Sequence, residues 1–196
     1  QPRSRGLGDV YKRQVYFLED YRVTLSELLM PASDISEQIS LAGTEASGTG
    51  NMKLMLNGAI TLGTLDGANI EIKDAVGDEN IIIFGMKTEE VNDLKRTGYN
   101  PESYYESNPV IKNCIDRMYH GINGCNFNEV ANSLKNSDPY MVLADFDSYR
   151  KAQAYSSECY KDSKKWTQMS LNNIAGAGIF SADRAVTEYA KDIWGL

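Results

Sequence analysis

A single lysine, Lys53, follows a glycine-rich turn in the stretch EASGTGNMKLMLNG, which covers residues 45–58. Gly48 and Gly50 allow the backbone to approach a ligand closely and to adopt positive φ angles. A helix that begins near Thr49 would direct its first unpaired N–H groups, and the positive end of its dipole, toward that turn. Lys53 would then stand one turn inside the helix, about 6 Å along its axis at ~1.5 Å per residue. This pattern predicts a phosphate site beside an amine.

Two common phosphate-binding patterns do not fit this stretch. A nucleotide P-loop needs Lys directly after its second glycine, and Thr49 stands there, although Gly43 and Gly48 have the required separation. A dinucleotide fingerprint needs a small residue where Lys53 stands, so that helix and strand can pack. Two interpretations remain. Lys53 forms an imine with pyridoxal phosphate, whose phosphate lies at the helix start, or the turn is followed by a solvated lysine without a ligand.

Composition and charge limit the class of protein. The 196 residues suffice for one domain with its own core, and 42% of them are apolar, as in ordinary globular chains. The formal net charge of −7 argues against nucleic acid as a partner, because nucleic-acid binders present a basic face. No run of about 18 apolar residues occurs, which argues against a membrane partner.

The cysteine and histidine content predicts no metal site. The three cysteines are widely spaced, without a CxxC pair, and the sequence holds one histidine. This pattern also argues against a disulfide framework and favours a reducing compartment, so we expect a cytoplasmic protein. Residues 1–14 follow neither a helix nor a strand period and lack the apolar segment of a secretory signal. We expect them to be extraneous or disordered, and residues 15–196 to form part of one domain.

Three apolar, β-rich runs predict buried parallel strands: VYFL at 15–18, AITLGTLDG at 59–67 and ENIIIFG at 79–85. Residues 31–43 predict a loop with short turns. Residues 68–77 alternate like a strand, but the surrounding α/β rhythm favours a helix. The sequence therefore predicts βαβ units in an α/β fold. Because most sheets have more than three strands, we expect further strands upstream of this chain.

Start and stop signals place the helices. Thr24 and Glu27 form a capping box before a helix that Pro31 ends, and the helix from Thr49 is expected to stop at Asn57-Gly58. Further helix starts are predicted at Thr88, Pro101, Asn108-Pro109 and Ser181. The last helix gathers its apolar residues on one face: Val186, Tyr189, Ala190, Ile193 and Trp194. We expect this helical tail to pack on the sheet or on another domain, with Tyr189 and Trp194 facing a core.

Four stretches resemble the C-terminal part of the α-glucan phosphorylase family: FLEDYRVTLSE at 17–27, SEQISLAGTEASGTGNMKLMLNGAITLGTLDGANIE at 36–71, ENIIIFGM at 79–86 and YAKDIWG at 189–195. The likeness runs from about Val15 to Leu196, and residues 45–58 are its most specific part. The resemblance implies the C-terminal part of a Rossmann-like domain in a two-domain GT-B glycosyltransferase fold, with a helical C-terminal tail. It also implies a homodimer in the full-length protein.

The resemblance implies roles for the residues around the turn. Lys53 matches the Schiff-base lysine that carries the cofactor, pyridoxal 5′-phosphate. Further cofactor contacts fall on Gly48, Thr49, Gly50, Tyr21 and Arg22. Contacts to glucosyl hydroxyls fall on Glu45, Ser47 and Gly48. Asp20 departs from the family pattern, which has Asn there, and its negative charge is expected to weaken the hold of Arg22 on the cofactor phosphate.

The activity implied by the resemblance is phosphorolysis of an α-1,4-glucan by inorganic phosphate, which releases α-glucose 1-phosphate with retained configuration. The polymer stays open among glycogen, starch and maltodextrin. We expect the isolated chain to be inactive, because the groups that bind the attacking phosphate match no residues here. Two other interpretations stay open: a binding module without catalysis, and a nucleotide-sugar glycosyltransferase of the same fold that uses no pyridoxal phosphate.

Overall fold

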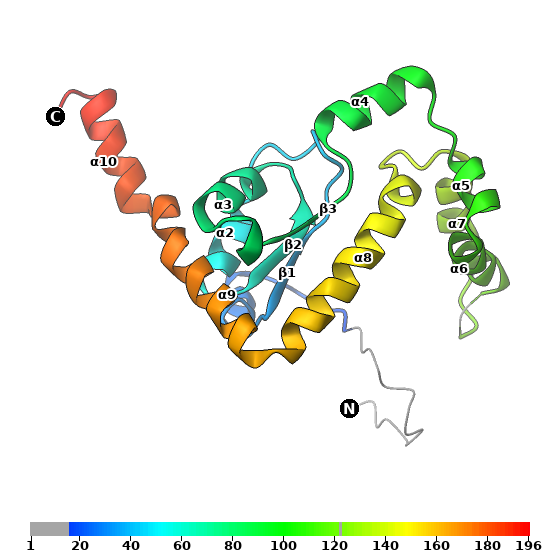
Figure 1. Cartoon of the computed structure of the whole chain (residues 1–196), viewed down its shortest axis with the longest axis horizontal. Coiled ribbons are helices and arrows are strands. Elements are labelled where there is room, and N and C mark those ends of the chain that lie inside the picture. The colour runs from blue at the N-terminus through cyan, green and yellow to red at the C-terminus, as the bar shows by residue number, and fades with distance from the viewer. Residues whose placement is uncertain (1–15, 122) are drawn as a thin grey trace.

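The centre of the molecule is a parallel β-sheet. We describe a computed structural model of the chain over residues 16–121 and 123–196 (Figure 1). Within these residues the sheet has the order β1-β2-β3, with strands β1 (Ile35–Gln38), β2 (Ile60–Thr64) and β3 (Ile82–Phe84). The predicted α/β class is confirmed.

The register of the sheet brings the carboxyl ends of the strands together. β1 pairs with β2 through Ile35 and Ile60, and β2 pairs with β3 through Leu62 and Ile82, in both cases in parallel. Open α/β sheets place their ligand sites outside this edge. The segments that leave it are the loop after β1 and the turn after β2, and the glycine-rich turn follows the first of them.

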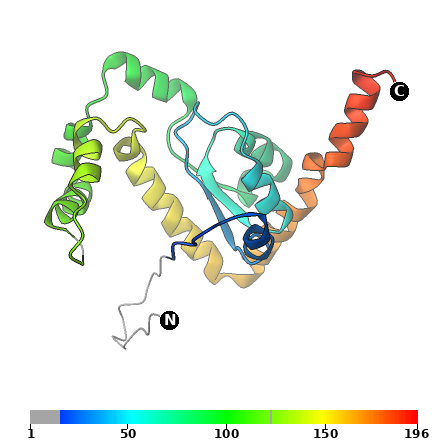
Figure 2. The same cartoon turned by 180° about the vertical axis from the view of Figure 1, so that it is seen from behind.

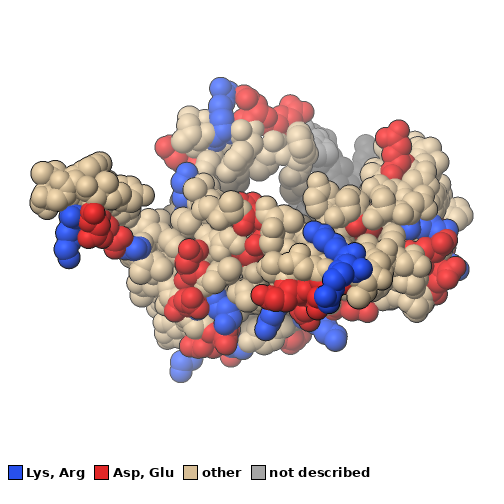
Figure 3. All heavy atoms as spheres, turned by 90° about the horizontal axis from the view of Figure 1, so that it is seen from above, with Lys and Arg blue, Asp and Glu red and all other residues tan. Residues whose placement is uncertain are grey.

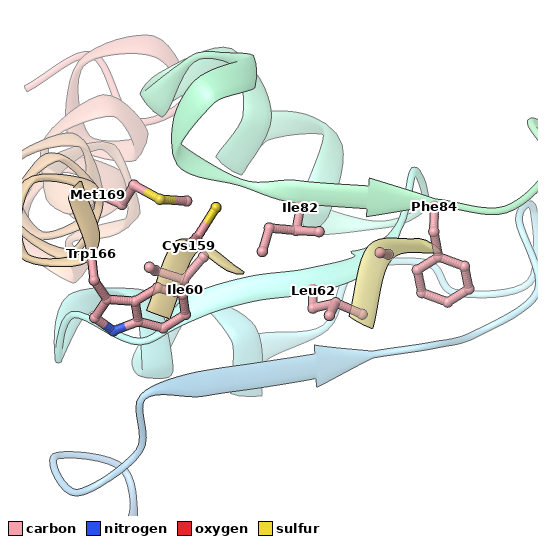
Figure 4. Close-up of a cluster of buried hydrophobic side chains, with 8 residues drawn as sticks. Ile60, Leu62, Ile82, Phe84, Cys159, Trp166 and Met169 are labelled. Carbon is pink, nitrogen blue, oxygen red and sulfur yellow. The ribbon is translucent and has the colours of Figure 1, made fainter. Parts of the chain in front are cut away.

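Helices cover both faces of the sheet. α8 (Val142–Lys161) packs along one face, and α2 (Thr49–Leu56) and α3 (Ala68–Val76) pack on the other (Figure 1). α9 (Ser163–Gly176) contacts both layers. Because β2 lies between two covered faces, all five of its residues are buried, as an apolar parallel strand requires. One hydrophobic core cluster joins β2, β3, α8 and α9 (Figure 4). It consists of Ile60, Leu62, Ile82, Phe84, Ala152, Cys159, Trp166 and Met169.

A helical lobe extends from the sheet. It begins with α4 (Thr88–Thr97) and continues through α5 (Pro101–Ser107), α6 (Pro109–His120) and α7 (Asn128–Asn136). Its core contains Ile111, Ile115, Ala131 and Leu143. Figure 2 shows the lobe at one end of the molecule and α10 (Ala182–Asp192) at the other. On the face drawn in Figure 3, basic and acidic side chains lie interspersed.

Two short 3₁₀ turns and one more helix complete the described elements. The turns η1 (Asp78–Asn80) and η2 (Ala177–Phe180) precede β3 and α10, and α1 (Val23–Leu29) precedes β1. Over the described residues, no helix combines the length and the hydropathy that crossing a membrane requires.

The outer edge of β1 has no neighbouring strand among the described residues. Glu37 lies on this edge, and its carboxylate accepts hydrogen bonds from the Tyr149 hydroxyl at 3.2 Å and from the Gln153 side chain. A charged side chain on an edge strand is a common way to limit unwanted pairing.

Two predictions about strands are wrong. Residues 31–43 are not only loop, because β1 forms within them; its sequence ISEQ is weakly apolar, but pairing with the buried β2 decides its conformation. Tyr16–Leu18 form no strand and are exposed. Apolar, β-rich composition does not by itself form a strand, because a strand also needs a neighbouring strand in register with it. Val15 and residues 1–14 lie outside the described residues.

The helix predictions are mostly confirmed. α2 begins at Thr49 and residues 68–76 are helical. The Asn108 side chain accepts from the Val110 N–H at 3.0 Å, and the Ser181 hydroxyl accepts from the Arg184 N–H at 3.2 Å. Pro101 opens α5 as predicted.

Two threonines expected to cap helices do not do so. The observed N-cap lies two residues before Thr24 in α1 and one residue before Thr88 in α4. α1 starts at Val23 with Arg22 as its N-cap, so the expected capping box of Thr24 and Glu27 does not form. Thr88 is the first residue of α4, and the cap is Lys87, whose N–H donates to Glu90 at 2.7 Å.

The expectation that Tyr189 and Trp194 face a core is wrong within the described chain. Tyr189 is 52% exposed and Trp194 is 60% exposed, and no residue of α10 is buried. α10 projects away from the sheet (Figures 1 and 2). Packing of the tail on another domain stays a prediction.

Candidate functional site

The glycine-rich turn opens α2 as the sequence predicts. Gly48 is the N-cap residue, and its φ of +89° lies in the left-handed region that favours glycine. No side chain of the described residues caps this helix start. A Cβ added to Gly50 would meet no atom within 4 Å, so the space over the turn is open. The first N–H groups of α2 are therefore accessible to an anion.

Lys53 stands on the same side of α2 as Thr49, because residues four apart share a helix face. The Cα–Cβ bonds of a helix tilt toward its N-terminus, so the Lys53 side chain leaves the helix on the side of the turn. Lys53 is exposed, and its ammonium group makes no ion pair within the described part of the chain. The structure thus brings an accessible amine and an open helix start together.

The other predicted substrate residues lie in the loop between β1 and α2. Glu45 and Ser47 are both exposed, and the Ser47 N–H donates to the Glu45 carboxylate at 3.3 Å. The loop is held by hydrogen bonds to a residue from another part of the sheet. One carboxylate oxygen of Asp66, in the turn after β2, accepts from the Thr44 and Glu45 N–H groups at 3.1 and 2.8 Å.

The first turn of α2 has its own support. The Asn51 side chain donates to Asn69 Oδ1 at 2.8 Å, and the Asn69 amide donates to the Thr64 carbonyl at 2.9 Å. Both asparagines are 2% exposed. Sequence reasoning missed Asp66 and Asn69. The available signal was the stretch LDGAN at 65–69, which covers the glycine turn at the end of the second predicted strand and so falls at the ligand-binding edge of the sheet.

Within the described residues, neither Tyr21 nor Arg22 makes a hydrogen bond or ion pair with residues 48–53. Tyr21 is 56% exposed. The Arg22 guanidinium instead contacts the Asp20 carboxylate at 2.5 Å, with both side chains largely exposed. An exposed pair of this kind contributes little to stability. The Arg22 guanidinium is therefore paired with Asp20, two residues earlier in the sequence.

A second buried carboxylate lies near the same edge of the sheet. Asp145, in the first turn of α8, is 8% exposed and accepts from the Met86 N–H at 2.8 Å. Burial raises the pKa of this carboxyl above its ordinary value of 3.8. Ile39, Leu41, Phe84 and Tyr149 join Asp145 around an apolar cavity of about 190 Å³. None of the predicted site residues lines it.

The fold and the site together define an α/β protein with a glycine-capped helix start and a nearby exposed lysine at the carboxyl edge of a parallel sheet. A family model described as carbohydrate phosphorylase matches residues 9–196. The chain belongs to the carbohydrate phosphorylase family.

Individual relatives agree with this assignment. The chain is 48% identical over 194 residues to the muscle form of glycogen phosphorylase from Ovis aries and from Mus musculus, and 48% identical over 195 residues to the brain form from Homo sapiens. Each comparison covers 97% of this chain but 23% of the relative. The chain thus spans about a quarter of the length of these proteins.

Proposed function

We propose that the chain is the C-terminal part of a glycogen phosphorylase. The full-length protein would cleave α-1,4-glucan with inorganic phosphate and release α-glucose 1-phosphate with retained configuration. The observation that carries this proposal is the uncapped start of α2, with Gly48 at positive φ and Lys53 one turn inside, in a chain 48% identical to glycogen phosphorylases.

The residues present fit pyridoxal 5′-phosphate. The open space over Gly50 and the lack of a side-chain cap on α2 within the described residues favour an anionic group at this helix start, and Lys53 would bind the cofactor aldehyde. When bound, the cofactor supplies a phosphate whose second pKa near ~6 allows proton exchange near neutral pH. The part of this chain is to hold that phosphate at the helix start and to fix its distance from the sugar.

The loop before α2 is proposed to bind the glucosyl unit. Glu45 offers a carboxylate and Ser47 a hydroxyl at the exposed surface of the loop, and Gly48 offers a backbone N–H. Such groups hydrogen-bond sugar hydroxyls. Because these residues are only a few positions from the turn, the sugar and the cofactor phosphate would lie side by side.

The rest of the protein is needed for activity. The chain spans 23% of its relatives, and β1 has a pairing partner on one side only within the described residues. We propose that upstream strands complete a Rossmann-like domain, that the GT-B cleft and its phosphate-binding groups lie outside this chain, and that the enzyme is a cytoplasmic homodimer. In that assembly Tyr21 and Arg22 would reach the cofactor.

Trapping of the cofactor tests the proposal. The full-length protein that contains this chain is incubated with pyridoxal 5′-phosphate, reduced with borohydride and digested for mass analysis. We expect a pyridoxyl group on Lys53, loss of it in Lys53→Arg, and its retention in Lys87→Arg, a lysine at another helix start. An unmodified Lys53 at saturating cofactor would instead support a nucleotide-sugar glycosyltransferase.

Phosphorolysis separates the enzyme from a binding module. The full-length protein with glycogen and inorganic phosphate should release α-glucose 1-phosphate, and the 196-residue chain alone should not. A trapped cofactor without any phosphorolysis would point to a protein that binds glucan but does not cleave it.

A further inference from the structure

The loop that carries Glu45 is tied to the turn after β2 by a single carboxylate. Asp66 Oδ2 accepts from the N–H groups of Thr44 at 3.1 Å and Glu45 at 2.8 Å. Asp66 is 6% exposed, and it forms no ion pair within the described residues. A buried carboxylate without a cation is costly unless backbone donors compensate, so these two hydrogen bonds are what Asp66 depends on.

The same turn holds the loop a second time. The Ala68 N–H donates to the Ser47 carbonyl at 2.6 Å. Gly67 has a φ of +51°, and a Cβ added there would lie 2.5 Å from the Ser47 carbonyl oxygen. Only glycine allows this approach. The backbone is therefore fixed on both sides of Ala46, which sets the separation of the Glu45 and Ser47 side chains.

The cofactor side of the site depends on different contacts. The first turn of α2 is held by Asn51, Asn69 and the Thr64 carbonyl, and none of these contacts involves the Asp66 side chain. The Asp66 backbone does meet this network, since its N–H donates to the Thr64 carbonyl and its carbonyl accepts from the Asn69 N–H, but Asp66→Ala keeps both groups. The turn after β2 thus supports the sugar loop, and the asparagine pair supports the helix start.

We propose that Asp66 is a positioning residue for glucosyl recognition, acting through the loop of Glu45 and Ser47 and separately from cofactor binding. This inference rests on the proposed function. It predicts that loss of the Asp66 oxygen weakens binding of α-glucose 1-phosphate while the cofactor stays on Lys53. Loss of Asn69 has the opposite pattern, since it releases the first turn of α2.

The kinetic experiment uses the full-length protein that contains this chain. In Asp66→Ala we expect the KM for α-glucose 1-phosphate to rise about 10-fold with kcat within about 3-fold of the parent. Asp66→Asn keeps an oxygen that can accept both N–H groups and should restore most of the loss. Asp78→Ala is the matched control, because Asp78 is an exposed carboxylate at the far end of α3. The borohydride-trapped group on Lys53 should be unchanged in all three.

The second measurement is independent of activity. Hydrogen exchange of the Thr44 and Glu45 amides in the 196-residue chain should accelerate in Asp66→Ala and not in Asp78→Ala. A parental KM in Asp66→Ala, with the cofactor in place, overturns the inference and leaves the proposed function standing. An unmodified Lys53 in the parent overturns the proposed function. Unchanged hydrogen exchange at residues 44–45 in Asp66→Ala would overturn the role of Asp66 in holding the loop.

Discussion

Two regions of the molecule differ in how their side chains are packed. One is the sheet with its loops, and the other consists of the outer helices α1 and α10. Around β2, the buried side chains of Asp66 and Asn69 have hydrogen-bond partners within the described chain, although the buried Thr61 hydroxyl on β2 has none there. α1 and α10 have no buried residue, although α10 presents a well-formed apolar face. The candidate site therefore lies in the region whose polar contacts are made within this chain, whereas the outer helices have their apolar surface available for contacts beyond it.

The largest expected effect contrasts the two regions directly. Leu62→Ala removes a fully buried side chain from the core cluster and should lower the free energy of unfolding by ~2–5 kcal/mol. Ile193, which directly follows α10, is 68% exposed, so Ile193→Ala should change the free energy of unfolding by less than ~0.5 kcal/mol. Urea unfolding of the 196-residue chain measures both. Equal losses would show that α10 is packed in solution.

The next prediction concerns the close approach at Gly67. Gly67→Ala adds a Cβ that meets the Ser47 carbonyl and must also adopt a positive φ, so we expect a loss of ~1–3 kcal/mol. Gly98→Ala has a positive φ but open space, and it isolates the backbone cost. Gly178→Ala has neither feature and should be neutral. If thermal unfolding ranked Gly98→Ala below Gly67→Ala in stability, the contact with Ser47 would not matter.

A third prediction uses the buried carboxylate of Asp145. Its folded-state pKa is raised by burial, so the folded protein binds the proton more tightly than the unfolded chain does. Stability contributed by this proton is present below the ordinary pKa and is lost as the pH rises through the raised value. Asp145→Asn lacks this loss and can still accept from the Met86 N–H, so its stability relative to the parent should increase with pH.

Unfolding midpoints from pH 3 to 8 measure the effect of Asp145→Asn. Asp183→Asn, in the first turn of the exposed α10, is the control. A difference between Asp145→Asn and the parent that stays constant with pH would contradict a raised pKa.

The smallest expected effect belongs to the outer region. Arg184 and Glu188 form an ion pair at 2.8 Å on α10, with both side chains 50% exposed. Glu188→Gln should change the unfolding free energy by at most ~0.5 kcal/mol, and less at high salt. A larger loss, measured by urea unfolding at low salt, would show that α10 is coupled to the core.

The candidate site could largely be located from the sequence. The helix start at Thr49 and the position of Lys53 follow from local signals, namely the glycines and the stop at Asn57. These signals lie within a few residues of one another, so short-range physics decides them. Caps at Asn108 and Ser181 were predictable for the same reason.

The supports of the site could not be predicted in this way. Asp66 accepts hydrogen bonds from Thr44 and Glu45, which precede it by 22 and 21 positions, and Asn69 is hydrogen-bonded to Asn51, 18 positions earlier. Such contacts depend on the order of the strands. That order could not be predicted, because the polar sequence ISEQ of β1 gives no strand signal. The exposure of Tyr189 was missed because an apolar helix face shows that a partner is needed but not which chain segment supplies it.

The free edge of β1 has a consequence for handling this chain in isolation. No strand among residues 16–121 and 123–196 pairs with this edge, so its N–H and C=O groups form a template on which a strand of a second molecule can add, which is how sheets begin to aggregate. Glu37 opposes that process while it is charged, because two such edges would place like charges opposite each other. Replacing Glu37 with a neutral residue would remove this repulsion, so the isolated chain would associate more readily through this edge.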